Sequence, residues 1–172
     1  MTASPATAPA VDYPDAQADA ERAAAAGFTP EVTARLLNYV AALNLSDKVR
    51  QAEANAGIIA RAEAAGDPDR ADFQRVHGHP RQSFYRLADP VGRQRYLRVV
   101  DVNAIAADAL PGLPARSVEA FVEIATGLVY KPDGWKRPAK GARYSLATDE
   151  DAAKLIAAAG QYAYLYRAPH LV

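Results

Sequence analysis

The spacing of apolar residues predicts helices in the first third of the chain. Between residues 17 and 66 we predict three of them: a short alanine-rich helix over 17–26, a second after Thr29, and a third from Ser46 to about residue 65. The second helix has the clearest apolar face, formed by Val32, Leu36, Leu37, Tyr39, Val40 and Leu43. The third has few large apolar residues, so we expect its buried face to be thin.

From residue 83 onward, short runs rich in β-branched and aromatic residues replace the helical pattern. The runs cover residues 84–88, 96–102, 121–124, 128–131 and 143–146. Turn-forming stretches separate them, with Asp89-Pro90-Val91-Gly92 after the first run and Ala125-Thr126-Gly127 after the third. We therefore predict a meander of antiparallel strands.

A final helix is predicted over about residues 149–166, because Thr148 followed by acidic residues is a typical helix start. Its spacing places Tyr162 and Tyr166 one turn apart and Tyr164 on another face. We expect Tyr166 to lie on the buried side.

These elements together predict an α+β fold. It consists of N-terminal helices, a small antiparallel sheet of about four or five strands, and a C-terminal covering helix. Residues 1–16 are rich in Ala, Pro, Thr and Asp and are predicted to form a disordered tail. Residues 17–172 then form a single domain, with a helical part (17–66) and a sheet with its C-terminal helix (83–172). The polar stretch of residues 67–80 is predicted to be a linker or long loop.

Composition limits the class of protein. The chain has 172 residues, no cysteine, and a formal net charge of zero. No apolar run approaches the roughly 20 residues that a membrane span needs, and the N-terminus has neither the basic start nor the apolar core of a signal peptide. We expect a cytoplasmic protein without disulfides and without membrane association; the sequence predicts no particular oligomeric state.

The charge is unevenly distributed. Residues 1–72 contain 11 acidic and 6 basic side chains, whereas residues 73–172 contain 9 acidic and 14 basic ones. This asymmetry is consistent with an acidic partner for the second half, or with two halves that pack together and neutralise each other.

Two segments concentrate the basic residues. Residues 131–143 carry five, against the single acid Asp133: Lys131, Lys136, Arg137, Lys140 and Arg143. Residues 75–98 carry six arginines, among them Arg95 and Arg98. A sheet that shows arginines and aromatic rings on one face is typical of proteins that bind single-stranded nucleic acid. Alternatively, the aromatic residues form the core and the arginines a solvated face.

The only tryptophan, Trp135, follows the Lys131-Pro132-Asp133-Gly134 turn and lies inside the first basic segment. Such a residue either fills the core or presents its ring to a partner. Together with Tyr144, it is our candidate for a stacking surface.

No catalytic motif is present, so we expect no enzymatic activity and no cofactor. The pair His77 and His79 offers two imidazoles to a metal if that segment is extended, but a metal site usually has three or four protein ligands. The carboxylate pair Glu119 and Glu123 is interpreted as part of a solvated face.

The segment from Tyr130 to Tyr144, YKPDGWKRPAKGARY, resembles a "YK..GWK.PAKG.RY" stretch found in short uncharacterised proteins of tailed phages and mobile elements. Those proteins often carry a preceding "FVD..TG" hairpin, which Phe121-Val122-Glu123 and Thr126-Gly127 match with Glu in place of Asp. The resemblance covers about the last 50 residues. It implies a phage-related setting and brings no assigned activity.

The sequence therefore predicts a non-enzymatic accessory protein. Its basic loop, helped by Arg95 and Arg98, would bind nucleic acid or another polyanion. The alternative is a protein-interaction module, either a homo-oligomer or an inhibitor of a host protein, that uses the same loop and the tyrosine-rich C-terminal helix.

Overall fold

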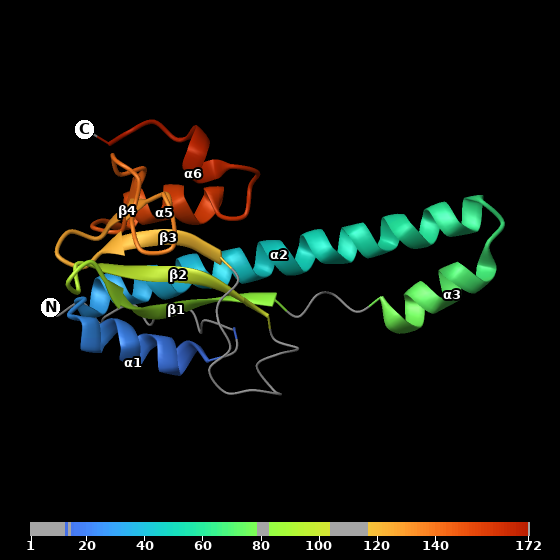
Figure 1. Cartoon of the computed structure of the whole chain (residues 1–172), viewed down its shortest axis with the longest axis horizontal. Coiled ribbons are helices and arrows are strands. Elements are labelled where there is room, and N and C mark those ends of the chain that lie inside the picture. The colour runs from blue at the N-terminus through green and yellow to red at the C-terminus, as the bar shows by residue number, and fades with distance from the viewer. Residues whose placement is uncertain (1–12, 14, 79–82, 104–116, 172) are drawn as a thin grey trace, which may run out of the picture.

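The computed structural model describes residues 13, 15–78, 83–103 and 117–171. The helices are α1 (Ala16–Ala26), α2 (Pro30–Ala64), α3 (Pro68–His77), α5 (Asp149–Ala158) and α6 (Tyr164–Arg167). The strands are β1 (Ser83–Val91), β2 (Tyr96–Asn103), β3 (Ser117–Glu123), β4 (Leu128–Tyr130) and β5 (Tyr144–Ser145). They form one antiparallel sheet in the order β1-β2-β3-β4-β5, which confirms the predicted α+β meander (Figure 1).

Helices cover one face of the sheet. The main core joins side chains of α1, α2, α5 and α6 to strand residues such as Leu87, Leu97, Val99 and Val122. The opposite face carries a smaller cluster made of strand residues alone, centred on Val100, Val118 and Phe121. The two faces therefore differ in kind: one is the helix-packed core, and the other is the side on which the strands meet the 131–143 loop.

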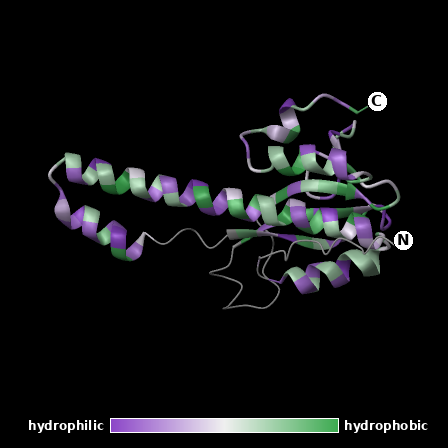
Figure 2. Cartoon of the chain, turned by 180° about the vertical axis from the view of Figure 1, so that it is seen from behind, coloured by the Kyte–Doolittle hydropathy of each residue, from purple (hydrophilic) through white to green (hydrophobic). Residues whose placement is uncertain are grey.

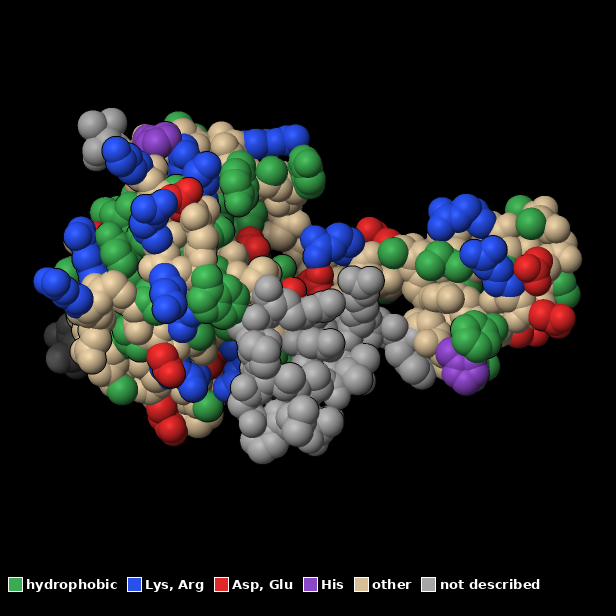
Figure 3. Space-filling model, viewed as in Figure 1, with side chains coloured by type: hydrophobic (Ala, Val, Ile, Leu, Met, Phe, Trp, Pro, Cys, Tyr) green, Lys and Arg blue, Asp and Glu red, His purple; other side chains and the backbone are tan. Residues whose placement is uncertain are grey.

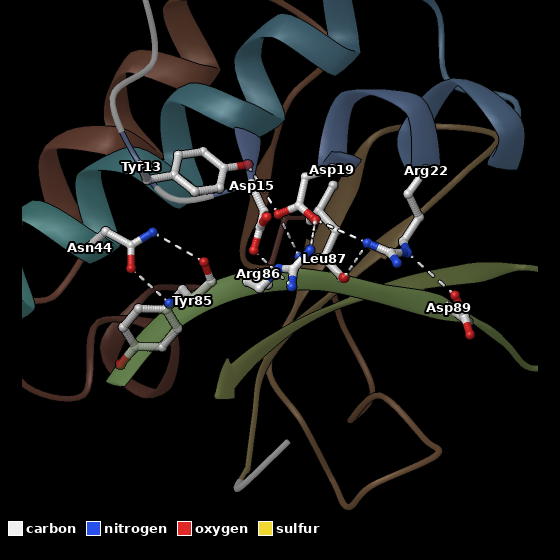
Figure 4. A network of polar contacts seen from close by, with 9 residues as sticks. All are labelled: Tyr13, Asp15, Asp19, Arg22, Asn44, Tyr85, Arg86, Leu87 and Asp89. Carbon is white, nitrogen blue, oxygen red and sulfur yellow. Dashed lines mark hydrogen bonds and ion pairs between the residues drawn. The ribbon is translucent and has the colours of Figure 1, made fainter. Parts of the chain in front are cut away.

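A polar network fastens α1 and α2 to the edge strand β1 (Figure 4). Asp19 of α1 is fully buried, and its carboxylate accepts hydrogen bonds from the backbone N–H of Leu87 (3.0 Å), the Tyr13 hydroxyl (3.1 Å) and the Arg22 guanidinium (3.0 Å). Burial raises the pKa of Asp19, while these donors and Arg86 act in the opposite direction. The paired donors compensate much of the cost of burying the carboxylate.

Asn44 makes the equivalent link for α2. Its side-chain amide donates to the Tyr85 carbonyl (3.1 Å), and its side-chain oxygen accepts from the Tyr85 N–H (2.7 Å). One side chain thus completes the backbone pairing of an edge strand. Tyr13, which the sequence placed in a disordered tail, is buried in this region; residues 1–12 and 14 of that tail lie outside the described residues.

Helix α2 is one continuous helix of 35 residues, so the predicted break before Ser46 is wrong. Thr29 caps its N-terminus, as expected, with its side chain accepting from the N–H of Val32. Asp47 caps nothing; instead it accepts side-chain hydrogen bonds from Arg50 and Gln51 within the helix. At ~1.5 Å per residue the helix is about 52 Å long, and its second half projects beyond the sheet (Figure 1).

The predicted linker at residues 67–80 is also wrong, because most of it forms α3. Asp67 caps this helix by accepting from the N–H of Arg70, and Pro68 occupies its first turn. Helix α3 packs beside the projecting half of α2 and is predominantly hydrophilic (Figure 2). Ala62 and Ala71 are the buried apolar residues where the two helices meet, so the predicted thin buried face is confirmed.

Two further boundaries differ from the prediction. Strand β1 continues through Pro90 to Val91, and the chain turns at residues 92–95. The predicted C-terminal helix ends at Ala158, because Gly160 has φ of +77° and lies against Ser46 of α2. Among the described residues, no helix is long and apolar enough to cross a membrane.

Candidate functional site

The 131–143 loop, from here on called the basic loop, is a small hairpin. Pro132 and Pro138 form an isolated antiparallel bridge, and the Asp133 N–H donates to the Arg137 carbonyl (3.0 Å). Gly134 lies at the tip, where the positive φ of 150° suits glycine. This pairing brings the exposed residues 133–137 to the end of the hairpin.

Trp135 lies in this tip and does not fill the core. Its side chain is 41% exposed, and the Arg98 guanidinium carbon lies 5.5 Å from the centroid of its ring. The Arg98 guanidinium is itself held by two hydrogen bonds to the Asp89 carbonyl, each 3.3 Å. The two residues come from parts of the sequence 37 positions apart, and the structure brings them together as a cation–π pair.

Arg98 belongs to an aromatic row that crosses the strands. It pairs with Phe121 of β3, which in turn pairs with Tyr130 of β4. The Tyr96 ring makes edge-to-face contacts with both Phe121 (6.3 Å) and Tyr130 (5.7 Å). Phe121 is buried under this row, whereas Tyr96 and Tyr130 are half-buried. The sheet therefore fixes Arg98 at the edge of a rigid aromatic cluster.

The loop cations differ in how far they are neutralised. Arg137 forms an ion pair with Asp133 (2.6 Å) across the hairpin. Among the residues that the structure describes, no carboxylate forms an ion pair with Lys136 or Lys140, and both side chains are exposed. Figure 3 shows Lys and Arg side chains spread over this face of the body. Positive charge is thus available at the loop.

Three of the predicted site residues have partners within the protein. Arg143 donates to the Ala168 carbonyl (2.8 Å) and so holds the C-terminal segment. Tyr144 packs against the main core with its ring 6.2 Å from that of Tyr164. The Lys131 ammonium lies 4.7 Å from the centroid of the Tyr166 ring. These three contacts shape the base of the loop.

Arg95 is neutralised by Glu123. Its guanidinium lies 2.6 Å from the Glu123 carboxylate, which also accepts a hydrogen bond from the Thr126 hydroxyl (2.6 Å). The Thr126 hydrogen bond and Arg95 hold the pKa of Glu123 below its ordinary value. Glu123 is buried, so the expectation of a solvated carboxylate there is wrong.

The described residues contain no group of three or more side chains placed to hold a metal ion. His77 is the last residue of α3, where its ring contacts Phe73 (4.6 Å between centroids). His79 lies outside the described residues. The extended His77/His79 arrangement considered from the sequence therefore does not hold at His77, which is helical.

The C-terminal tyrosines are arranged opposite to the prediction. Tyr164 is buried, and its hydroxyl is hydrogen-bonded to that of Tyr39 in α2. Tyr162 and Tyr166 are 84% and 60% exposed. The break at Gly160 rotates this segment relative to a continuous helix, which turns Tyr164 inward.

A pocket that the sequence gave no reason to expect lies between this segment, α2 and the sheet. Its lining includes Arg50, Tyr85, Glu119, Tyr164 and Tyr166. Burial and nearby carboxylates raise the pKa of Tyr85 to about 12, and burial raises that of Glu119 above its ordinary value. Glu119, like Glu123, is therefore no part of a solvated face. An acidic residue within the otherwise apolar run of β3 was the signal available in the sequence.

Comparison with known proteins gives one match. Residues 29–166 match the model of a family described as "Family of unknown function (DUF7717)". The matched range takes in α2, all five strands and the basic loop, and it leaves α1 outside. No curated protein and no solved structure matches the chain.

Proposed function

We propose a binding role without catalysis for this chain, which belongs to the family of unknown function DUF7717: it holds nucleic acid, preferably single-stranded, on the basic loop and Arg98. The same proposal places it among accessory proteins of phages or mobile elements, which act in the cytoplasm, as the resemblance of residues 130–144 suggests. The observation that carries the proposal is the pairing of Trp135 with Arg98.

The Trp135 ring has the properties of a base-stacking platform. It is aromatic, 41% exposed, and held in place by a guanidinium 5.5 Å from its centroid. Stacking of a base on an aromatic side chain contributes roughly 1–3 kcal/mol and tolerates any base, because every base has a π-face. A ring that is already positioned loses little conformational entropy on binding.

The cations around Trp135 supply the phosphate contacts. Lys136 follows it directly, Arg137 comes next, and Lys140 lies on the returning arm of the hairpin. The net charge of the whole chain is zero, so this local excess of positive charge is a property of the loop and not of the composition. Phosphate contacts made by Lys and Arg supply most of the sequence-independent affinity for nucleic acid.

A protein-interaction surface is the second candidate function. It is supported by Tyr162 and Tyr166, which expose large rings beside the basic loop, with Arg167 5.2 Å from the Tyr162 ring centroid and Lys131 against Tyr166. Tyrosine and arginine are enriched at the centres of protein interfaces. Salt separates the two functions, because nucleic-acid binding weakens steeply with added salt and an apolar interface does not.

The test replaces Lys136, Arg137 and Lys140 together by Ala and measures binding of a fluorescent single-stranded oligonucleotide at several salt concentrations. Each lost phosphate contact on a single strand lowers the slope of log K against log [salt] by ~0.7, so we expect the slope to fall by about 2. The wild-type protein should bind most tightly at the lowest salt.

The matched control replaces Lys48, Arg61 and Arg70 by Ala, which removes the same charge from the projecting helices. This variant should keep the wild-type slope if the basic loop is the binding surface. Equal losses in both triple variants would show that net charge alone governs binding, and unchanged binding in the loop variant would refute the proposal.

A further inference from the structure

The pocket beside the C-terminal segment has the composition of an organic-cation site. Its volume is about 220 Å³, far above the ~10–15 Å³ that a single water needs. Four tyrosines belong to its walls: Tyr85, Tyr162, Tyr164 and Tyr166. Aromatic walls around a carboxylate are the arrangement by which proteins recognise ammonium groups.

Glu119 is the carboxylate in this pocket. The Tyr164 hydroxyl is hydrogen-bonded to it, and Tyr164 is in turn hydrogen-bonded to Tyr39. Because a phenol has one proton, Tyr164 donates to Glu119 and accepts from Tyr39. Within the part of the chain that the structure describes, no Lys, Arg or His forms an ion pair with Glu119. A largely buried carboxylate without a counterion favours either a proton or an incoming cation.

Arg50 also lines the pocket, but its charge is already matched. Its guanidinium forms an ion pair with Asp47 one turn earlier in α2, and it is hydrogen-bonded to Tyr85. Arg50 and Asp47 together add no net charge, so Glu119 makes the pocket negative. At the rim, the Lys131 ammonium already lies 4.7 Å from the Tyr166 ring centroid, which shows that these walls can accept an ammonium group.

The size of the pocket limits the ligand. Sites for drug-sized molecules and cofactors usually measure ~300–1,000 Å³, so 220 Å³ is too small for a nucleotide. It suits a group of a few heavy atoms. The negative charge and the tyrosine walls then favour an amine over a neutral molecule of the same size.

We propose that this pocket binds a small alkylammonium group, with Glu119 as its counterion and the tyrosine rings as its walls. This function is separate from nucleic-acid binding by the basic loop and does not depend on it. The cation is either a free amine or a lysine side chain of a partner protein, which share the same recognition chemistry.

The test compares n-butylammonium with 1-butanol, a neutral molecule with the same number of heavy atoms. Titrations followed by NMR of the tyrosine ring signals should give saturable shifts for Tyr85 and Tyr164 with n-butylammonium and none with 1-butanol at equal concentration. Nα-acetyl-lysine amide serves as the side-chain probe: tighter binding than n-butylammonium assigns the cation to a protein, and weaker binding assigns it to a free amine.

Glu119→Gln keeps the shape and the acceptor for Tyr164 but removes the charge, so it should weaken n-butylammonium binding at least about tenfold. Glu150→Gln, an exposed carboxylate of α5, is the matched control and should bind as the wild type does. Tyr162→Ala changes an exposed wall residue without disturbing the core and should weaken binding roughly twofold to fivefold. Equal shifts with 1-butanol, or wild-type affinity in both Glu119→Gln and Tyr162→Ala, would overturn the proposal.

Discussion

Replacing Asp19 by Ala tests whether the buried network fastens α1 to the sheet. The substitution leaves three donors without their acceptor in a region that excludes water: the Leu87 N–H, the Tyr13 hydroxyl and the Arg22 guanidinium. Breaking a buried charged pair by removing one partner costs ~3–5 kcal/mol. The relief of desolvating the carboxylate is already contained in that range, so we expect a loss of about 4 kcal/mol.

The assay is urea denaturation at 25 °C followed by circular dichroism. A loss of this size should lower the midpoint with little change in the m-value, and it should lower Tm by about 8–16 °C for a chain of this length. Asp19→Asn keeps one acceptor oxygen and should lose about half as much stability.

The matched control is Glu21→Ala on the same helix, which removes an exposed carboxylate whose described partner is Gln17. That variant should remain within ~0.5 kcal/mol of the wild type. If Asp19→Ala lost no more than Glu21→Ala, the network would not stabilise the fold, and the reasoning from buried donors would be refuted.

Two further stability predictions follow from single positions. Gly160→Ala should cost at least ~2 kcal/mol, because an added Cβ would lie 2.0 Å from the Ser46 hydroxyl at a φ of +77°, whereas Gly66→Ala has a similar φ but open space and should cost only about 1 kcal/mol; equal losses in denaturation experiments would contradict the clash. Glu119→Gln should raise Tm more at pH 7.5 than at pH 4.5, because the raised pKa of Glu119 means that the wild type is stabilised below its ordinary value of 4.5 and loses that stabilisation as the pH rises through the folded-state pKa; a pH-independent difference would contradict this.

The sequence predicted the elements whose signals are local. Thr29 and Thr148 mark their helix starts, since each caps through a side chain that accepts from the third residue onward. The strands likewise follow runs of β-prone residues that pair with their neighbours in sequence. A meander needs no long-range information, so local pattern was sufficient to predict it.

The errors have long-range causes. Ser46 and Asp47 look like a helix start, but Asn44 is fixed to Tyr85 of β1, and the helix continues past the sheet. The end of α5 depends on the close approach of Gly160 to Ser46, more than 100 residues apart. Neither contact can be read from the neighbouring sequence.

The candidate site was predictable in part. The cluster of Lys136, Arg137 and Lys140 around Trp135 is visible in the sequence as composition. The partner of Trp135, by contrast, is selected by the fold, which brings Arg98 to its ring and pairs Arg95 with Glu123. The Glu119 pocket joins α2, β1, β3 and the C-terminal segment, so only the tertiary structure could assemble it.

The most direct test of the proposed function uses the fluorescence of Trp135, which is the only tryptophan in the chain. The protein is titrated with single-stranded and duplex oligonucleotides at about 50 and 200 mM salt. We predict a quench with the single strand that weakens steeply at the higher salt and is reduced when Lys136, Arg137 and Lys140 are replaced by Ala. A signal that stays constant with both nucleic acids at both salt concentrations would contradict the proposal.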